Sequence, residues 1–217
     1  MTEKLLQLID KSYHLTEKQA EGFSYAKVGP MKFTIRSFYA EGLGCVSLMK
    51  GSAMFGLMKM DTLIVNPFEK DMPLFSYDRI HAMGNDTLLL ELYDTRIQRG
   101  PLSGNLKKIT AEYSSIADEP AASAWYDDIK LSESLKKKGK KASTPALDEL
   151  TERYFDEYVK LCIDAPACDI EAKKKAASVY TEGLLNNGGP STDQFVKAKG
   201  REYTQEMFRK YLFGTGV

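Results

Sequence analysis

Apolar and polar residues alternate in short runs through the middle of the chain, between residues 32 and 94. Turn residues separate the runs at Glu41-Gly42, Lys50-Gly51 and Gly84-Asn85-Asp86. Period-two alternation bounded by such residues predicts β-strands, and the short connections predict that neighbouring strands are antiparallel. The expected strands are residues 32–40, 43–50, 53–60, 61–66, 74–83 and 87–94.

Helical periodicity replaces this alternation toward both ends of the chain. An amphipathic helix is expected at the amino terminus, where Leu5, Ile9 and Tyr13 share one face. Further helices are expected at residues 100–116, from Thr144, at 169–185 and from Ser191, and a further strand at 124–132. Thr144 is expected to cap its helix, with Pro145 at the first helical position, and Ser191 fits a capping box with Gln194. Gly200 is expected to break or kink the last helix.

A strand-rich middle bracketed by helices predicts a single domain over residues 1–217. We expect an α+β protein, an α/β/α sandwich whose central antiparallel sheet is flanked by helices. The run LKKKGKK at 135–141 is interpreted as a solvated loop, because a dense lysine cluster is usually exposed.

Charge and composition narrow the classes of partner. Lysine plus arginine equals aspartate plus glutamate at 30 each, so net charge gives no reason to expect nucleic acid. No apolar run reaches the roughly 20 residues of a membrane span, and the acidic amino terminus is unlike a signal peptide. We therefore expect a soluble, cytoplasmic protein. The 3 cysteines lack CxxC spacing, which argues against a disulfide framework and a zinc site.

Familiar cofactor and catalytic motifs are missing from the sequence. It contains no GxGxxG, P-loop, GxSxG or HExxH motif, and only His14 and His81 could serve as histidine ligands or bases. We expect no metal site. A redox function would have to take its electrons from outside the chain.

Asp78 is the first candidate for a catalytic side chain. It lies in the predicted strand 74–83, among Leu74, Phe75, Tyr77 and Ile80. Burial disfavours the charged form of a carboxyl group, so Asp78 could keep its proton near neutral pH and act as an acid. The alternative is an ordinary aspartate on the solvated face or edge of the sheet.

Several segments together resemble one protein family. PLFSYD at 73–78, GND at 84–86 and LLLELYD at 88–94 form the specific part, and Trp125 with acidic residues at 127–128, the helix from 147 and YTQEMFRKYLF at 203–213 match more weakly. This order resembles the ferredoxin-dependent bilin reductases, which are related to red chlorophyll catabolite reductase. The resemblance spans most of the chain from about Lys32.

The resemblance implies a function and a reaction type. The substrate would be a linear tetrapyrrole such as biliverdin, reduced two electrons at a time by single-electron transfers from ferredoxin or flavodoxin. No redox cofactor would be bound to the protein, whose task would be to protonate a radical intermediate. The lysines of the 135–141 run could meet an acidic ferredoxin. Two alternatives remain, a non-enzymatic tetrapyrrole-binding or carrier protein and an enzyme with an unrelated substrate on the same fold.

The resemblance also assigns site residues. The essential aspartate of the family corresponds to Asp78, and a second catalytic aspartate on the carboxy-terminal helices to Asp193, although Asp193 could simply favour a helix amino terminus. The family's polar residue before the loop is histidine or asparagine, and Thr62, Ile64 or Asn66 would take its place. These three share one strand face. Together with Ser76 they are expected to contact the substrate.

Overall fold

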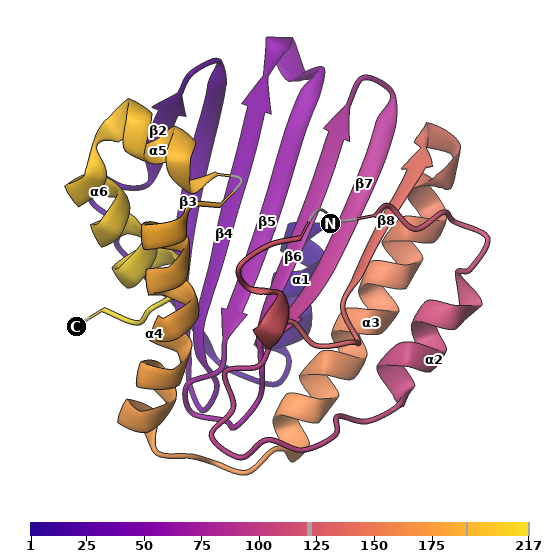
Figure 1. Cartoon of the computed structure of the whole chain (residues 1–217), viewed down its shortest axis with the longest axis vertical. Coiled ribbons are helices and arrows are strands. Elements are labelled where there is room, and N and C mark those ends of the chain that lie inside the picture. Colours follow the sequence, from indigo (N-terminus) through magenta and orange to yellow (C-terminus); the bar gives the residue numbers. More distant parts are fainter. Residues whose placement is uncertain (121–122, 190, 217) are drawn as a thin grey trace.

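One antiparallel sheet of eight strands forms the centre of the molecule (Figure 1). The computed structural model describes residues 1–120, 123–189 and 191–216. The strand order is β1-β3-β4-β5-β6-β7-β8, and β2 pairs with the other half of β3. The strands are β1 (Leu15–Lys18), β2 (Tyr25–Val28), β3 (Met31–Ala40), β4 (Gly44–Ala53), β5 (Met58–Asn66), β6 (Leu74–Ala82), β7 (Asn85–Tyr93) and β8 (Leu135–Lys140).

Helices cover both faces of the sheet, as Figure 1 shows. On one face lie α1 (Thr2–Asp10), α2 (Asn105–Glu112) and α3 (Thr144–Asp164). On the other lie α4 (Ile170–Asn187), α5 (Thr192–Lys199), α6 (Arg201–Glu206) and the π-helical turn η4 (Met207–Leu212). Short 3-10 turns are η1 (Met54–Gly56), η2 (Asp127–Ile129) and η3 (Lys141–Ser143). The predicted α/β/α sandwich is confirmed.

Strand alternation divides the apolar residues between two cores. Phe75 and Tyr77 of β6 point toward α3, where they pack in a large cluster with the aromatic residues of that helix. Leu74 and Tyr93 belong to a second cluster formed with α4, α5 and η4. Successive side chains of a strand point to opposite faces. Ser76 and Asp78 of β6 are therefore directed toward the carboxy-terminal helices.

Three local predictions were wrong. Residues 53–60 are not a separate strand, because they contain the end of β4, the turn η1 and the start of β5, which runs on without interruption to residue 66. In the turn, Met54 and Phe55 have positive φ angles of 52° and 55°. Residues 124–132 contain a 3-10 turn instead of a strand. The run 135–141 is not a loop, because it forms β8 at the edge of the sheet, and Lys137 is buried there with Nζ 3.0 Å from the carbonyl oxygen of Ile116.

Helix ends follow the sequence only in part. Gly200, with φ of 90°, separates α5 from α6, as expected for a glycine in a predicted break. Ser191 makes no capping hydrogen bond, and the Thr144 hydroxyl donates to Asp86 on the sheet instead of capping α3. Asp169 caps α4 by accepting a hydrogen bond of 2.6 Å from the amide of Ala172.

A buried lysine fixes α4 against the sheet. Nζ of Lys173 donates to the carbonyl oxygens of Met72 and Thr95 at 2.7 Å and 2.8 Å, and to the Thr95 hydroxyl at 2.8 Å. Burial lowers the pKa of Lys173 to about 8. These bonds place the helix that forms one wall of the cleft described below. Over the described residues, none of the helices combines the length and apolarity that a membrane crossing requires.

Candidate active site

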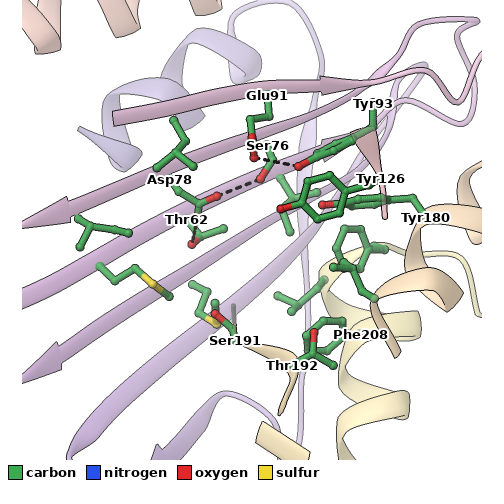
Figure 2. A pocket seen from close by; sticks show the side chains of 18 residues that line it. Thr62, Ser76, Asp78, Glu91, Tyr93, Tyr126, Tyr180, Ser191, Thr192 and Phe208 are labelled. Atoms are coloured by element: carbon green, nitrogen blue, oxygen red, sulfur yellow. Dashed lines mark hydrogen bonds between the residues drawn. The ribbon is translucent and has the colours of Figure 1, made fainter. Parts of the chain in front are cut away.

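A cleft lies between the sheet and the carboxy-terminal helices (Figure 2). Its floor comes from β4 to β7, and its walls come from residue 126, α4, residues 191–192, η4 and the segment that follows η4. The enclosed volume is about 160 Å³. The cleft is lined by Met49, Met60, Thr62, Ile64, Ser76, Asp78, Ile80, Leu89, Glu91, Tyr93, Tyr126, Tyr180, Leu184, Ser191, Thr192, Phe208, Leu212 and Phe213.

The floor is polar in one place only, where three neighbouring strands carry polar residues at matching positions. Thr62 of β5 lies opposite Asp78 of β6, and Ser76 of β6 lies opposite Glu91 of β7. Aliphatic side chains such as Ile64 and Leu89 occupy the intervening floor positions. The result is a compact polar group within a largely apolar surface, which is the usual composition of a small-molecule site.

Asp78 is half-buried in the centre of this floor. Its Oδ1 accepts a hydrogen bond of 2.5 Å from the Thr62 hydroxyl, and its Oδ2 accepts one of 3.2 Å from Ser76. Burial raises the pKa of Asp78 to about 6, and the charge on Glu91 also raises it. The two hydrogen bonds act in the opposite direction and lower the pKa. A carboxyl group with this pKa can release and regain a proton near neutral pH.

Glu91 is a second carboxyl group on the floor of the cleft, and the sequence reasoning missed it. Oε2 accepts a hydrogen bond of 2.8 Å from the Tyr93 hydroxyl, and Lys130 approaches Oε1 at 3.4 Å. The alternation of side chains in LLLELYD could have identified Glu91 as a cleft residue, because Leu88, Leu90 and Leu92 are buried on the α3 face. The intervening residues Leu89, Glu91 and Tyr93 therefore face the cleft.

Stacked aromatic residues close the cleft at the end of β7. The rings of Tyr93 and Tyr180 stack with their centroids 4.0 Å apart, and Tyr126 meets Tyr93 edge-on at 5.5 Å. Trp125 supports this wall by donating from Nε1 to the carbonyl oxygen of Gly188 at 3.1 Å. Burial raises the pKa of Tyr93, Tyr126 and Tyr180, so their phenols hold their protons firmly.

The carboxy-terminal wall is tied to the sheet by two hydrogen bonds. The Ser47 hydroxyl donates to the carbonyl oxygen of Leu212 at 2.8 Å, and Nδ2 of Asn66 donates to that of Phe213 at 2.6 Å. Asn66 is fully buried and does not line the cleft. The structure therefore gives Asn66 a supporting position behind Phe213, in place of the substrate contact expected from its strand face.

Asp193 lies outside the cleft. It is exposed in the first turn of α5, and its carboxylate lies beside Gly188, where an added Cβ would be 2.9 Å from Oδ1. The two preceding residues, Ser191 and Thr192, line the cleft. Of the residues singled out from the sequence, Asp78, Thr62, Ile64 and Ser76 come together, whereas Asn66 and Asp193 do not join them.

The histidines do not contribute to the cleft either. His81 lines a separate hollow on the opposite side of β6, next to Asp86, and His14 precedes β1. Within the described ranges, no group of three or more histidine, cysteine, aspartate and glutamate side chains is placed to hold a metal ion. The acid-base groups of the cleft are thus carboxyls and phenols.

Comparison with known proteins supports the fold. No protein-family model and no curated protein matches the sequence. Among solved structures, the chain is similar to the crystal structure of phytochromobilin synthase from tomato in complex with biliverdin. The TM-score is 0.78 at 14% sequence identity, over 99% of this chain and 83% of that chain.

The two proteins share one fold. Phytochromobilin synthase is a ferredoxin-dependent bilin reductase, so the resemblance predicted from PLFSYD and its neighbouring segments is confirmed for the fold. The shared architecture is the mixed one described above, an antiparallel sheet with helices on both faces.

Proposed function

We propose that this protein binds a linear tetrapyrrole in the cleft and reduces it by two electrons, taking single electrons from ferredoxin or flavodoxin. Asp78 is the proton donor. The observation that carries the proposal is a half-buried carboxyl group with a pKa of about 6 on the floor of an apolar cleft. The cleft lies in the fold of a protein whose structure was solved with biliverdin.

The apolar lining suits the conjugated rings of a tetrapyrrole. Met49 and Met60 on the floor offer adaptable apolar surface, and Phe208 of η4 offers aromatic surface. The enclosed space of about 160 Å³ is smaller than the roughly 300–1,000 Å³ of most ligand sites. We therefore expect the tetrapyrrole to displace the walls or to keep part of its length outside.

Asp78 supplies the proton, which a one-electron donor does not provide. A single electron added to the conjugated system creates a radical anion, and a proton from the Asp78 O–H group would convert it to a neutral radical at the carbon nearest the carboxyl. The hydrogen bonds from Thr62 and Ser76 then stabilise the carboxylate that remains. The bound substrate accepts the electrons directly, so the proposal needs no redox group held by the chain.

The test is spectroscopic. Purified protein is mixed with biliverdin and the visible spectrum is recorded, first alone and then with reduced ferredoxin. A shifted bilin spectrum followed by conversion to a product with a shorter conjugated system supports the proposal. An unchanged spectrum of free biliverdin at micromolar protein and ligand would overturn it.

A carrier function is the second candidate. The position expected to hold a histidine or asparagine falls at Thr62, Ile64 or Asn66. Thr62 is committed to Asp78 by its hydrogen bond, Ile64 is apolar, and Asn66 does not line the cleft. With one acid-base group fewer, the cleft could hold a tetrapyrrole without reducing it. In the experiment above, this function gives a shifted bilin spectrum that stays constant after reduced ferredoxin is added.

A further inference from the structure

Only two carboxyl groups line the described part of the cleft, and they belong to neighbouring strands. Asp78 lies on β6 and Glu91 on β7, with Ser76 directly opposite Glu91 and hydrogen-bonded to Asp78. Figure 2 shows both side chains on the floor, next to Ser76. Asp193, the second aspartate expected from the sequence, is exposed beyond the wall.

We propose that Glu91 is the second proton donor of the cleft, so that Glu91 and Asp78 each pass one proton to the tetrapyrrole in a two-electron reduction. This inference rests on the proposed function and names the group that completes it. Glu91 thereby takes the role that the sequence resemblance gave to Asp193.

The step balances with two electrons and two protons. Two reduced ferredoxin molecules are each oxidised by one electron, and one double bond of the tetrapyrrole is reduced. The O–H bond of Asp78 breaks as one new bond to hydrogen forms on the substrate, and Asp78 then regains a proton from water. Glu91, whose charge raises the pKa of Asp78 in the resting cleft, first takes a proton from water. Its new O–H bond then breaks as the second bond to hydrogen forms on the substrate. One carboxyl group alone could supply only one of the two protons without being reprotonated between the electron transfers.

The remaining polar groups of the cleft are poor proton donors. Burial raises the pKa of all three tyrosine phenols that line it. The hydroxyl groups of Thr62, Ser76, Ser191 and Thr192 are far weaker acids than a carboxyl. Of the described lining residues, Glu91 is therefore the one apart from Asp78 that carries a carboxyl group.

Its hydrogen bonds hold Glu91 in a suitable orientation. Tyr93 fixes Oε2 at 2.8 Å and Lys130 approaches Oε1 at 3.4 Å, which leaves acceptor positions of both oxygens free toward the cleft. The side chain of Glu91 is 12% exposed and that of Lys130 is 21% exposed. Water can therefore reach the carboxylate on the Lys130 side while the substrate occupies the other.

The experiment compares Glu91→Gln with a matched control, Glu69→Gln. Glu69 also accepts a hydrogen bond from a tyrosine, Tyr39, at 2.7 Å, but it lies outside the cleft. Biliverdin binding is measured by absorbance, and reduction is followed with excess reduced ferredoxin across a pH series. We expect Glu91→Gln to bind biliverdin with similar affinity and to reduce it at least about 10²-fold more slowly. A bilin radical detected by electron paramagnetic resonance should accumulate, and Glu69→Gln should match the parent.

A second variant separates proton donation from support of the fold. Glu91→Asp keeps an acid but shortens it, whereas Glu91→Gln keeps the shape and loses the acid. Proton donation predicts that the aspartate variant is the more active of the two, and a structural role predicts the reverse order. The inference is overturned if the parent reduces biliverdin and Glu91→Gln has the same rate and pH profile. A parent protein that fails to bind or reduce biliverdin overturns the proposed function itself, and this inference with it.

Discussion

The hydroxyl of Thr62 donates a hydrogen bond of 2.5 Å to Oδ1 of Asp78, between directly paired positions of β5 and β6. This bond opposes the effect of burial, because it stabilises the charged form of the carboxyl group and so lowers its pKa. Together with the charge on Glu91, which raises the pKa, and the hydrogen bond from Ser76, which lowers it, these effects leave the pKa of Asp78 at about 6. Residue 62 is thus one of the groups that determine the pH at which the acid loses its proton.

Replacing Thr62 by valine should shift the pH dependence of turnover. Valine keeps the branched shape but cannot donate, so the pKa of Asp78 should rise above its present value of about 6. Turnover that needs protonated Asp78 should then persist to higher pH. The measurement is the rate of biliverdin reduction between pH 5 and pH 9. Thr34→Val, at an exposed position of β3, is the control, and an unshifted profile in Thr62→Val would contradict the assignment.

Asp78→Asn tests the acid directly. The amide keeps the size and an acceptor for the Thr62 hydroxyl, but it has no proton to give at neutral pH. We expect biliverdin to bind with an altered spectrum, and turnover to fall by about 10²–10⁴. Asp61→Asn removes a carboxyl group from the opposite face of β5 and should leave turnover unchanged. Equal rates in the two variants would show that Asp78 is not the proton donor.

The same carboxyl group should make stability depend on pH. Its pKa is raised from 3.8 to about 6 in the folded protein, so ionisation costs more there than in the unfolded chain. The contribution of Asp78 to stability is therefore complete below about pH 4 and is lost as the pH rises through 6. Thermal unfolding midpoints of the parent and Asp78→Asn should diverge over this range in favour of the variant. A constant difference between the two proteins would indicate that the pKa is not raised.

Local alternation was enough to place the centre of the site. In PLFSYD, the apolar residues Phe75 and Tyr77 require one buried face, which assigns Ser76 and Asp78 to the other. The same rule assigns Thr62 and Ile64 to the same face of the neighbouring strand. These positions follow from strand geometry and hairpin register, both of which are encoded within a few residues.

Residues that depend on distant packing were not predictable in this way. Lys137 lies in a lysine run typical of a loop, and only its pairing with Leu88 of β7 turns it into a buried strand residue. Asp193 lies beside Gly188 at the end of α4, a contact that the sequence of α5 alone does not specify. Asn66 shares the face of Thr62, but it lies at the end of β5 beneath the carboxy-terminal segment. The outcomes for Lys137 and Asn66 are decided by contacts between segments far apart in the chain.

Asn66 should matter for stability more than for chemistry. Replacing it by leucine leaves the buried carbonyl oxygen of Phe213 without its donor at 2.6 Å, which should cost about 1–3 kcal/mol. Urea unfolding of Asn66→Leu should therefore show a lower midpoint. Asn187→Leu, at an exposed position near the end of α4, should change the free energy of unfolding by no more than about 0.5 kcal/mol. Full stability of Asn66→Leu would show that the bond does not hold the carboxy-terminal wall.

The lysines of β8 divide into groups with different expected effects on an acidic electron donor. Lys137 is buried against Asp118, and Lys136 and Lys138 both lie near the carboxylate of Glu119, at 3.4 Å and 2.7 Å. Their charges are therefore largely compensated within the protein. Lys140 and Lys141 are exposed at the end of the strand, and Lys140 donates to the neutral side chain of Asn85.

Removing these two charges should slow a reaction that depends on encounter with ferredoxin. A double variant with Lys140→Gln and Lys141→Gln should reduce biliverdin about threefold to tenfold more slowly at low salt, because local charge steers association. Its rate should also depend less on ionic strength, since added salt screens the same attraction. A control with Lys11→Gln and Lys108→Gln loses the same charge at exposed positions of other segments, just after α1 and within α2. If both double variants keep the parental rate and salt profile, the end of β8 is not where the donor docks. If both slow equally, net charge alone is responsible.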